Sequence, residues 1–334
     1  MSEHRGLKRF VIFLTILAVF WAVANIIPLK KNYQDNPFLT DGLPMIAAHR
    51  GGADNNPENT MLAFREAVNT IGVDIIECDV QLTKDGYLVF CHDDYIDKDC
   101  NINGDVSPSE VNRLCENESN RHYVKDMTLD ELKQYNFGYY FEDENGVRIY
   151  KDEEDISSMG LSLVTPEELF NEFYETNPDL KFIIEIKNDG DLGKEASDKL
   201  CDILDKYPKY KENTVIGSFH PAIGGYLSKN HSDFYRGATI SDNILFTLTT
   251  KLFLAGLDRS DYACLQIPIE YDVAGIKLTL TTERAIKIAH ERGIAVQCWT
   301  INDPSEMRML IEMGVDCIMT DNPKLLKEIL EEYK

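Results

Sequence analysis

The sequence has few basic residues for its length. Its 334 residues carry 34 Lys and Arg against 57 Asp and Glu, a formal net charge of −23. Proteins that bind nucleic acid neutralise phosphates with Lys and Arg, so this balance argues against a nucleic acid partner. It also argues against adhesion of the whole protein to anionic lipid headgroups.

Several metal and cofactor signatures are absent. The eight cysteines form no Cys-x-x-Cys pair and no cluster with His at zinc spacing. No glycine-rich phosphate loop follows the first expected strand, and this disfavours a doubly wound nucleotide-binding sheet. A disulfide between Cys100 and Cys115 is left open, because it depends on export. Four cysteines lie in strand-like runs and are expected to be small core residues: Cys78, Cys91, Cys298 and Cys317.

Only one apolar run is long enough to cross a bilayer. Residues 10–27 contain no charged residue, and about 18 apolar residues can span the hydrocarbon core. We expect residues 1–28 to be a basic leader with a single-pass membrane anchor, and the remaining chain to lie outside the cytoplasm. The alternative is a signal peptide cleaved after Ala22-Val23-Ala24. A single span excludes a transporter.

Residues 45–334 alternate strand-like apolar runs with amphipathic helical patterns, after a short linker at 29–44. Strands are expected at 45–49, 75–80, 182–187, 214–219, 235–240, 263–267, 295–300 and 317–320. The clearest helices are expected at 59–70, 165–174, 196–206, 283–292 and 304–313. Eight strands in regular βα alternation predict an α/β fold of the (β/α)8 or TIM barrel type.

One connection interrupts this alternation. The segment between Asp79 and His92 is too short for a crossover helix, and it contains Lys84-Asp85-Gly86. Asp-Gly is a strong signal for a two-residue hairpin turn, so the two side chains are expected to meet across a hairpin. The polar segment at about 94–162 then reads as an insertion, a small lobe over the mouth of the barrel.

Polar residues follow several of the expected strands. The carboxyl ends of barrel strands converge on one face, so these side chains are expected to share one site. The expected set is His49, Arg50, Glu77, Asp79, His92, Glu185, Lys187, Ser218, Trp299 and Asp321.

These residue types suit acid–base chemistry on a phosphate beside a metal ion. Glu77, Asp79 and Glu185 would provide hard oxygen ligands for Ca²⁺ or Mg²⁺. The two cations would face the phosphate, and the two imidazoles would transfer protons.

Structural roles are the alternative for several of these residues. Trp299 could fill core space, Glu185 and Lys187 could form a surface ion pair, and Ser218 is expected to be structural. Asp321 could cap the last helix or a turn. Asn59 is expected to cap the helix that follows Pro57. Four histidines without comparable context are expected at the surface: His4, His122, His231 and His290.

The motifs, in this order, resemble the glycerophosphodiester phosphodiesterase family. The segment at 94–162 is similar to an insertion typical of that family. The matching pieces are His49-Arg50-Gly51, Pro57-Glu58-Asn59-Thr60, Glu77-x-Asp79, Lys84-Asp85-Gly86, His92-Asp93, Glu185-x-Lys187, Ser218-Phe219, Trp299-Thr300-x-Asn302, Gly314-Val315-Asp316 and Thr320-Asp321-x-Pro323.

The resemblance implies a metal-dependent enzyme that hydrolyses glycerophosphodiesters to an alcohol and glycerol 3-phosphate, as in membrane-bound bacterial members. It implies that His49 and His92 are the general acid and base. It assigns the metal to Glu77, Asp79 and Glu185, the phosphate to Arg50 and Lys187, and the pocket wall to Trp299. A longer loop at 52–56 and a longer insertion at about 105–125 leave the size of the substrate open.

Two alternative functions remain at this point. One is a lysophospholipase D-like activity on lysolipids. The other is a catalytically silent barrel that serves as a binding module tethered to a membrane. The complete set of polar residues disfavours the second.

Overall fold

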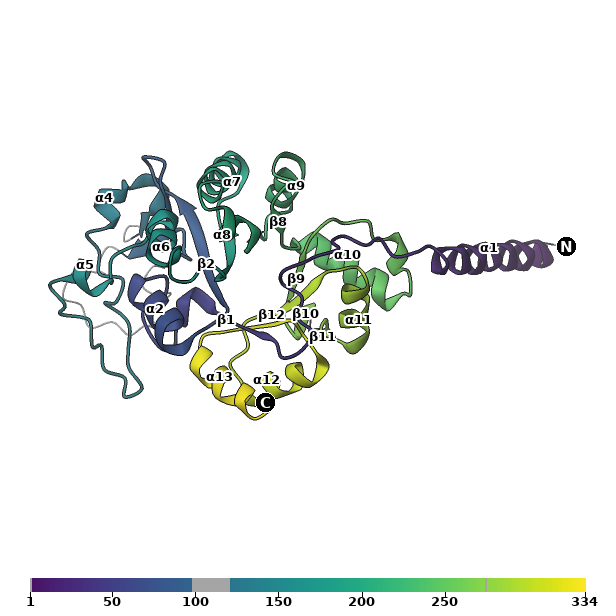
Figure 1. Ribbon diagram of the computed structural model, residues 1–334. Helices are drawn as coiled ribbons and strands as arrows, with labels where there is room; N and C mark the ends of the chain where they lie inside the picture. The colour runs from purple at the N-terminus through teal and green to yellow at the C-terminus, as the bar shows by residue number, and fades with distance from the viewer. Residues whose placement is uncertain (1, 98–120, 274) are drawn as a thin grey trace.

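The computed structural model describes residues 2–97, 121–273 and 275–334 (Figure 1). Eight parallel strands form a nearly closed barrel in the order β8-β7-β6-β2-β1-β13-β12-β9, which confirms the predicted TIM barrel. In chain order the strands are β1 (Met45–Ala48), β2 (Ile75–Leu82), β6 (Lys181–Ile186), β7 (Thr214–Gly217), β8 (Tyr235–Arg236), β9 (Cys264–Ile267), β12 (Ala295–Cys298) and β13 (Cys317–Thr320).

The fifth barrel strand is shorter than the prediction of 235–240. Thr239 forms a capping box at the start of α10 (Ile240–Lys251), so the chain leaves the sheet after two residues. An isolated parallel bridge between Gly237 and Cys264 joins this edge to β9. The helix cap therefore ends the strand early, although the apolar run in the sequence continues.

Amphipathic helices surround the strands and bury their apolar faces against them. The predicted cap Asn59 is wrong, because Thr60 accepts the hydrogen bond from the Ala63 N–H at 3.2 Å. The helices are α2 (Met61–Arg65), which continues as the π-helical turn η2 (Glu66–Ile71), α6 (Pro166–Phe173), α7 (Gly190–Leu204), α8 (Pro208–Glu212), α9 (Pro221–Asn230), α11 (Glu283–Glu291), α12 (Pro304–Met313) and α13 (Pro323–Glu331).

Small and branched side chains fill the inside of the barrel. Ala47, Ile75, Val215 and Ala263 are fully buried there, within a cluster separate from the layer between strands and helices. The four cysteines predicted to be core residues are buried: Cys78, Cys91, Cys298 and Cys317. Cys100 and Cys115 lie outside the described residues.

Residues 29–44 pack against the amino ends of the barrel strands. The Asn36 side chain donates to the carbonyl oxygens of Ala263 and Gly293 at 2.8 and 3.0 Å. Phe38 is fully buried in the interior cluster. This segment closes the end of the barrel opposite the strand carboxyl ends.

The predicted hairpin is present. β3 (Leu88–Phe90) pairs antiparallel with β2, and Gly86 in the turn has φ +82°, a conformation that glycine adopts without strain. The insertion continues with β4 (Tyr95–Asp97), β5 (Arg121–Tyr123), η4 (Val124–Asp126), α4 (Leu129–Leu132) and α5 (Ile156–Met159). A second hairpin joins β10 (Glu270–Val273) and β11 (Ile276–Thr279) beyond β9.

Helix α1 (Ser2–Asn25) projects away from the barrel (Figure 1). Its segment Lys8–Asn25 is long and apolar enough to cross a membrane, and only 6% of it is buried. A signal sequence near an N-terminus has the same length and composition.

Two histidines predicted to be surface residues have buried or half-buried partners instead. His290 Nε2 lies 2.8 Å from Oδ2 of Asp316, a fully buried carboxylate. His231 Nε2 lies 2.7 Å from Oδ1 of Asp198. Both imidazoles stay partly exposed, His290 at 35% and His231 at 18%, but the sequence did not indicate their partners, which come from distant parts of the chain.

Candidate active site

A cavity of about 150 Å³ opens at the carboxyl ends of the barrel strands. Parallel strands bring their ends to one face, so residues far apart in the sequence meet there. The cavity is lined by nine of the residues expected from the sequence: His49, Arg50, Glu77, Asp79, His92, Glu185, Lys187, Ser218 and Trp299.

Three carboxylates form the floor of this cavity. Glu77, Asp79 and Glu185 each place an oxygen within 4.8 Å of the other two. Glu77 is 4% and Asp79 2% exposed. Burial, followed by the charge of Asp79, raises the pKa of Glu77. Burial also raises the pKa of Glu185, although the Lys187 charge opposes it.

This carboxylate cluster fits a hard divalent cation. Among the described residues, Asp79 Oδ2 is buried and has no hydrogen-bond partner. A buried carboxylate oxygen without such a partner is unfavourable unless positive charge compensates it; Arg50 Nε, 3.5 Å away, supplies one such charge, and a bound cation would supply another. Ca²⁺ and Mg²⁺ prefer oxygen ligands of this type, and three carboxylates from adjacent strands provide them.

Two cationic side chains border the cluster. Lys187 Nζ lies 3.1 Å from Glu185 Oε1 and 3.6 Å from Asp79 Oδ1. Arg50 Nη1 lies 2.9 Å from Glu58 Oε2, and Arg50 Nε lies 3.5 Å from Asp79 Oδ2. Burial alone would lower the pKa of Lys187, but Asp79 and Glu185 outweigh it and raise the pKa. Both cations therefore stay charged at the cavity, and the Glu185–Lys187 pair lies inside the mouth.

His49 is oriented by a carboxylate that the sequence did not assign to this task. His49 Nδ1 lies 2.6 Å from Asp321 Oδ1, and Asn302 Nδ2 donates to Asp321 Oδ2 at 2.6 Å. Burial lowers the pKa of His49, but the Asp321 hydrogen bond and the Glu77 charge outweigh it, so the pKa is raised. His49 Nε2 lies 3.9 Å from Glu77 Oε2.

The alternative role considered for Asp321, a cap of the last helix, is not the one it has. Asn322 caps α13 instead, because its side chain accepts from the Leu325 N–H at 3.0 Å. The only sequence signal for the role of Asp321 was its position directly after the eighth strand.

His92 reaches the cavity from the β2–β3 hairpin. The Cys91 N–H donates to the Asp79 carbonyl at 2.9 Å, so His92 lies one residue beyond the level of Asp79. His92 Nδ1 lies 2.9 Å from Asp93 Oδ1. That hydrogen bond is the main reason why the pKa of Asp93 is lowered.

An aromatic wall lies beside Lys187. The rings of Trp299 and Phe219 meet edge to face with 5.5 Å between their centroids. Phe219 is 38% exposed, and Lys187 Nζ lies 5.9 Å from its ring centre. Ser218 Oγ donates to the Ile186 carbonyl at 2.9 Å, which agrees with its expected structural role. The sequence reading missed Phe219 and Glu58, although both adjoin residues that it singled out.

A second, larger cavity of about 750 Å³ lies between this site and the insertion. Arg50 and His92 border both cavities, so the two adjoin at these side chains. Aromatic residues line much of the larger space: Phe90, Tyr95, Tyr135, Phe137, Tyr140 and Phe141. A group bound at the smaller cavity could extend into the larger one.

Known proteins are similar to this chain in sequence and in fold. The model of the glycerophosphoryl diester phosphodiesterase family matches residues 49–325. A glycerophosphodiester phosphodiesterase of Caldanaerobacter subterraneus subsp. tengcongensis is 28% identical over 290 residues, which cover 86% of this chain and 98% of that protein. Lysophospholipase D GDPD1 of Mus musculus is 29% identical over 313 residues, 86% of each chain.

The fold has a matching solved structure. A phosphodiesterase of Oleispira antarctica, solved in complex with the product sn-glycerol-3-phosphate, superposes with a TM-score of 0.60 and 20% identity. The match covers 86% of this chain and 97% of that chain. At this identity, the likeness shows a common fold.

Proposed function

Because the chain belongs to the glycerophosphoryl diester phosphodiesterase family and is a phosphodiesterase, we propose that it hydrolyses glycerophosphodiesters to an alcohol and glycerol 3-phosphate. The observation that carries this proposal is the single cavity lined by two histidines, three carboxylates and two cationic side chains. Each of these groups has a task in the cleavage of a phosphodiester.

We assign the metal to Glu77, Asp79 and Glu185, with Ca²⁺ or Mg²⁺ as the ion. Support comes from their mutual distances and from the buried oxygen of Asp79 without a hydrogen-bond partner. A bound divalent cation would polarise a phosphoryl oxygen and offset charge that grows in the transition state. The burial of the cluster would strengthen this electrostatic effect.

Arg50 and Lys187 bind the phosphate in this proposal. A phosphodiester is an anion, so it repels an approaching nucleophile until positive groups compensate its charge. Both cations adjoin the carboxylate cluster, within 3.6 Å of Asp79. They can therefore contact the oxygens of the same phosphate that the metal would hold.

Cleavage of the diester needs two proton transfers, and in this proposal His49 carries out one of them and His92 the other. One accepts a proton from the nucleophile, which is water or the neighbouring glycerol hydroxyl, and the other protonates the leaving alkoxide. Attack by the glycerol hydroxyl would give a cyclic phosphate that water then opens. Asp321 holds His49 through Nδ1, which leaves Nε2 free for the substrate. Trp299 and Phe219 would pack against the glycerol carbons.

A second candidate is a lysophospholipase D-like activity on lysolipids. The similarity to the mouse lysophospholipase D and the cavity of about 750 Å³ beside His92 both favour it. A cavity of that size would accommodate a bulky alcohol group. The third possibility, a silent binding module, is disfavoured because the polar residues meet in one cavity.

For the cellular location, we propose that α1 is a single-pass anchor and that the barrel lies outside the cytoplasm. The apolar side chains of α1 are exposed, Phe10 at 58% and Ile16 at 61%, and such exposure is unfavourable in water. Detection of the uncleaved full-length chain in the membrane fraction, with the barrel open to external protease, would support this. A mature chain that begins near residue 25 would indicate a signal peptide.

The direct test is a hydrolysis screen with purified full-length protein. The substrates are glycerophosphocholine, lysophosphatidylcholine and glycerophosphate polymer, each with Ca²⁺, with Mg²⁺ or with EDTA. We expect a metal-dependent release of alcohol that is lost in His49→Ala and kept in His231→Ala, a histidine outside the cavity. Unchanged turnover in His49→Ala would contradict the proposed site.

A further inference from the structure

Helix α10 carries most of its apolar residues on the outside, and among them only Phe246 is buried in the core. Thr247, Thr249 and Thr250 are buried, whereas a surface helix normally buries its apolar face and exposes its polar one. Phe253 (51%) and Leu257 (39%) extend the exposed apolar surface past the helix end. We call these residues the apolar face: Ile240, Ile244, Leu245, Leu248, Leu252, Phe253 and Leu257.

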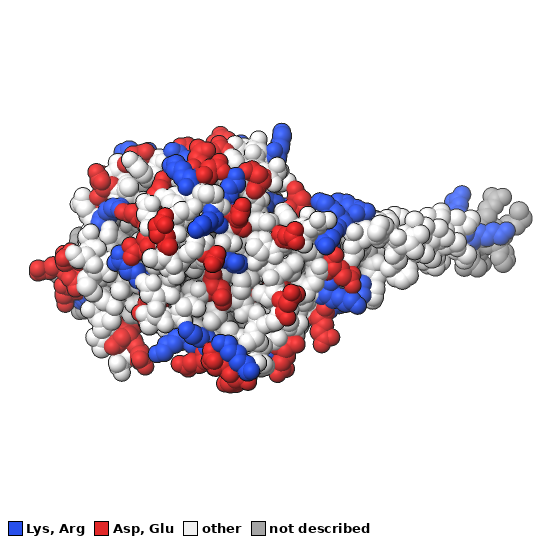
Figure 2. Space-filling model, in the orientation of Figure 1, with Lys and Arg blue, Asp and Glu red and all other residues white. Residues whose placement is uncertain are grey.

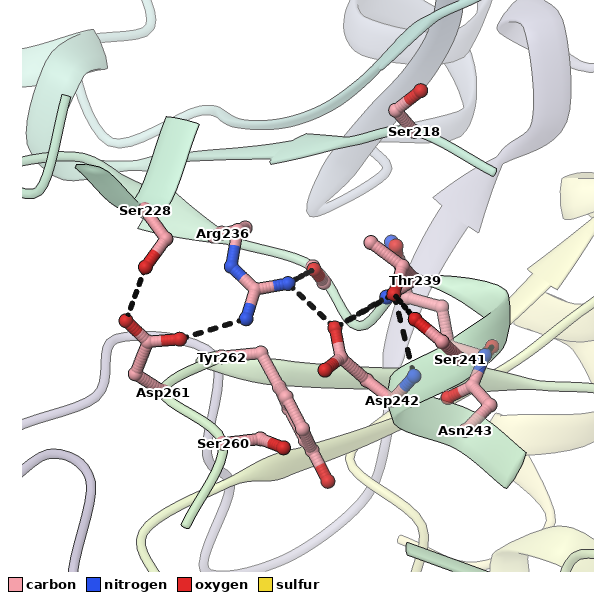
Figure 3. A network of polar contacts seen from close by, with 12 residues as sticks. Ser218, Ser228, Arg236, Thr239, Ser241, Asp242, Asn243, Ser260, Asp261 and Tyr262 are labelled. Carbon is pink, nitrogen blue, oxygen red and sulfur yellow. Dashed lines mark hydrogen bonds and ion pairs between the residues drawn. The ribbon is translucent and has the colours of Figure 1, made fainter. Parts of the chain in front are cut away.

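A polar network around the buried Arg236 side chain holds this helix in place (Figure 3). Arg236 Nη1 donates to Asp242 Oδ2 at 2.7 Å, and Arg236 Nη2 donates to Asp261 Oδ1 at 2.8 Å. Asp242 also accepts from the Thr239 hydroxyl at 2.8 Å, and Ser228 donates to Asp261 at 2.6 Å. The first turn of α10 is thereby fixed to the barrel, so the apolar face has a defined orientation.

The apolar face lies beside the foot of α1. The indole N–H of Trp21 donates to the Leu252 carbonyl at 3.0 Å. Gly256 approaches the chain so closely that a Cβ atom there would lie 2.2 Å from the Ile27 carbonyl oxygen. Figure 1 shows α1 leaving the body on the side of α10. The exposed apolar surfaces of α1 and α10 are therefore neighbours.

The charges around the apolar face differ from those of the whole chain. Residues 243–257 contain no Asp or Glu, although the chain has 57 of them. Lys30 Nζ donates to the Arg259 carbonyl at 3.0 Å, and the Arg284 guanidinium lies 4.0 Å from the ring centre of Phe253. Figure 2 shows Lys and Arg side chains where α1 joins the body, with some Asp and Glu side chains beside them. An apolar surface with a basic rim fits an anionic membrane surface.

We propose that the apolar face of α10 lies in the headgroup region of the bilayer that α1 crosses, with anionic lipids beside its basic rim. This inference rests on the anchoring of α1 proposed above. It adds that the barrel has a fixed orientation on the membrane and does not swing on a tether. Ile240 follows the carboxyl end of β8, at the end of the barrel that holds the active site. From there the helix runs to Leu252 at the foot of α1, so the barrel would lie on its side against the bilayer.

Quenching of tryptophan fluorescence by brominated lipids would test this. Full-length protein without its native tryptophans (Trp21→Phe, Trp299→Phe) is reconstituted into vesicles of phosphatidylcholine and phosphatidylglycerol with brominated acyl chains. Single probes are then introduced as Leu248→Trp on α10, Phe13→Trp on α1 and Leu192→Trp on α7. Leu192 is the matched control, because it is 39% exposed and α9 lies between α7 and α10 in Figure 1.

We expect the probes at positions 13 and 248 to lose most of their emission and the probe at 192 to keep it. Quenching at 13 but not at 248 would overturn this inference and leave the anchor intact. Absence of quenching at both 13 and 248 would overturn this inference and the proposed membrane anchor. A probe at 248 that is shielded from iodide in water but not quenched by the lipid would show that another protein copy covers the face, which also overturns the inference.

Discussion

The link between Asp321 and His49 makes a specific prediction about Asp321→Asn. Asn302 Oδ1 accepts from the Thr320 hydroxyl at 2.9 Å and from the Asp321 N–H at 3.0 Å. These bonds fix Asn302 so that its Nδ2 donates toward Asp321. An asparagine at 321 has one oxygen, and that oxygen would be held by Asn302. Its amide group would then face Nδ1 of His49.

The imidazole would respond by changing its tautomer. The carboxylate now favours a proton on His49 Nδ1, whereas an amide N–H there favours an unprotonated Nδ1 and a protonated Nε2. Loss of a charge-assisted hydrogen bond removes about 1.5–3 kcal/mol, or about 10- to 150-fold in rate. The wrong tautomer would lower the rate further. In serine protease triads, the corresponding Asp→Asn change lowers kcat by about 10⁴-fold. We expect kcat to fall by about 10² to 10⁴.

Steady-state kinetics with a soluble diester would measure this effect. KM should change little, because Asp321 orients a histidine and does not contact the phosphate in our proposal. Asp54→Asn is the matched control: it removes a carboxylate near Asp321 that has no contact with His49, and kcat should stay within about threefold. A loss confined to KM, or a kcat within threefold of the parent in Asp321→Asn, would refute the assigned role.

Four further predictions concern the metal, the phosphate and the fold. Glu185→Gln should weaken metal binding, so that activity recovers only at higher metal concentration in a titration. Lys187→Met should lower kcat by about 10²- to 10³-fold, because it removes a cation from the transition state. The Asp316 hydrogen bond raises the pKa of His290 although burial opposes it, so His290→Gln should destabilise the protein below about pH 6.5 and have little effect at alkaline pH, as urea unfolding would show. Phe38→Ala should reduce the free energy of unfolding by about 3–5 kcal/mol in the same assay, because it leaves a cavity in the barrel.

The sequence was sufficient for the barrel and for most of the site. Buried strands of a parallel sheet are continuous apolar runs, and their carboxyl ends meet at one face, so residues such as Glu77 and Glu185 could be placed together without coordinates. The Asp-Gly turn placed His92 near Asp79 to within one residue. These inferences succeed because each needs only a short stretch of sequence and the rule that the carboxyl ends of parallel strands meet at one face.

Features that depend on contacts between distant segments were not predictable in this way. The hydrogen bond of Asp321 joins the last strand to His49 after the first, and His290 in the last turn of α11 meets Asp316 just before β13. The outward apolar face of α10 has the composition of a buried helix, and only its neighbours show which side faces the barrel. Thr239 ended a strand early because its cap competes with the sheet.

The acidic composition of the chain and its proposed anionic partners are compatible because electrostatic forces in salt are local. At physiological ionic strength, exposed charges more than about 8 Å apart are largely screened from one another. A phosphate in the cavity would therefore respond mainly to Arg50, Lys187 and a metal held by the three carboxylates. In the same way, anionic lipid at the foot of α1 would meet Lys30, Lys251 and other nearby cations, with no acidic residue between 243 and 257. A net charge of −23 excludes adhesion through the whole surface, but it permits both local contacts.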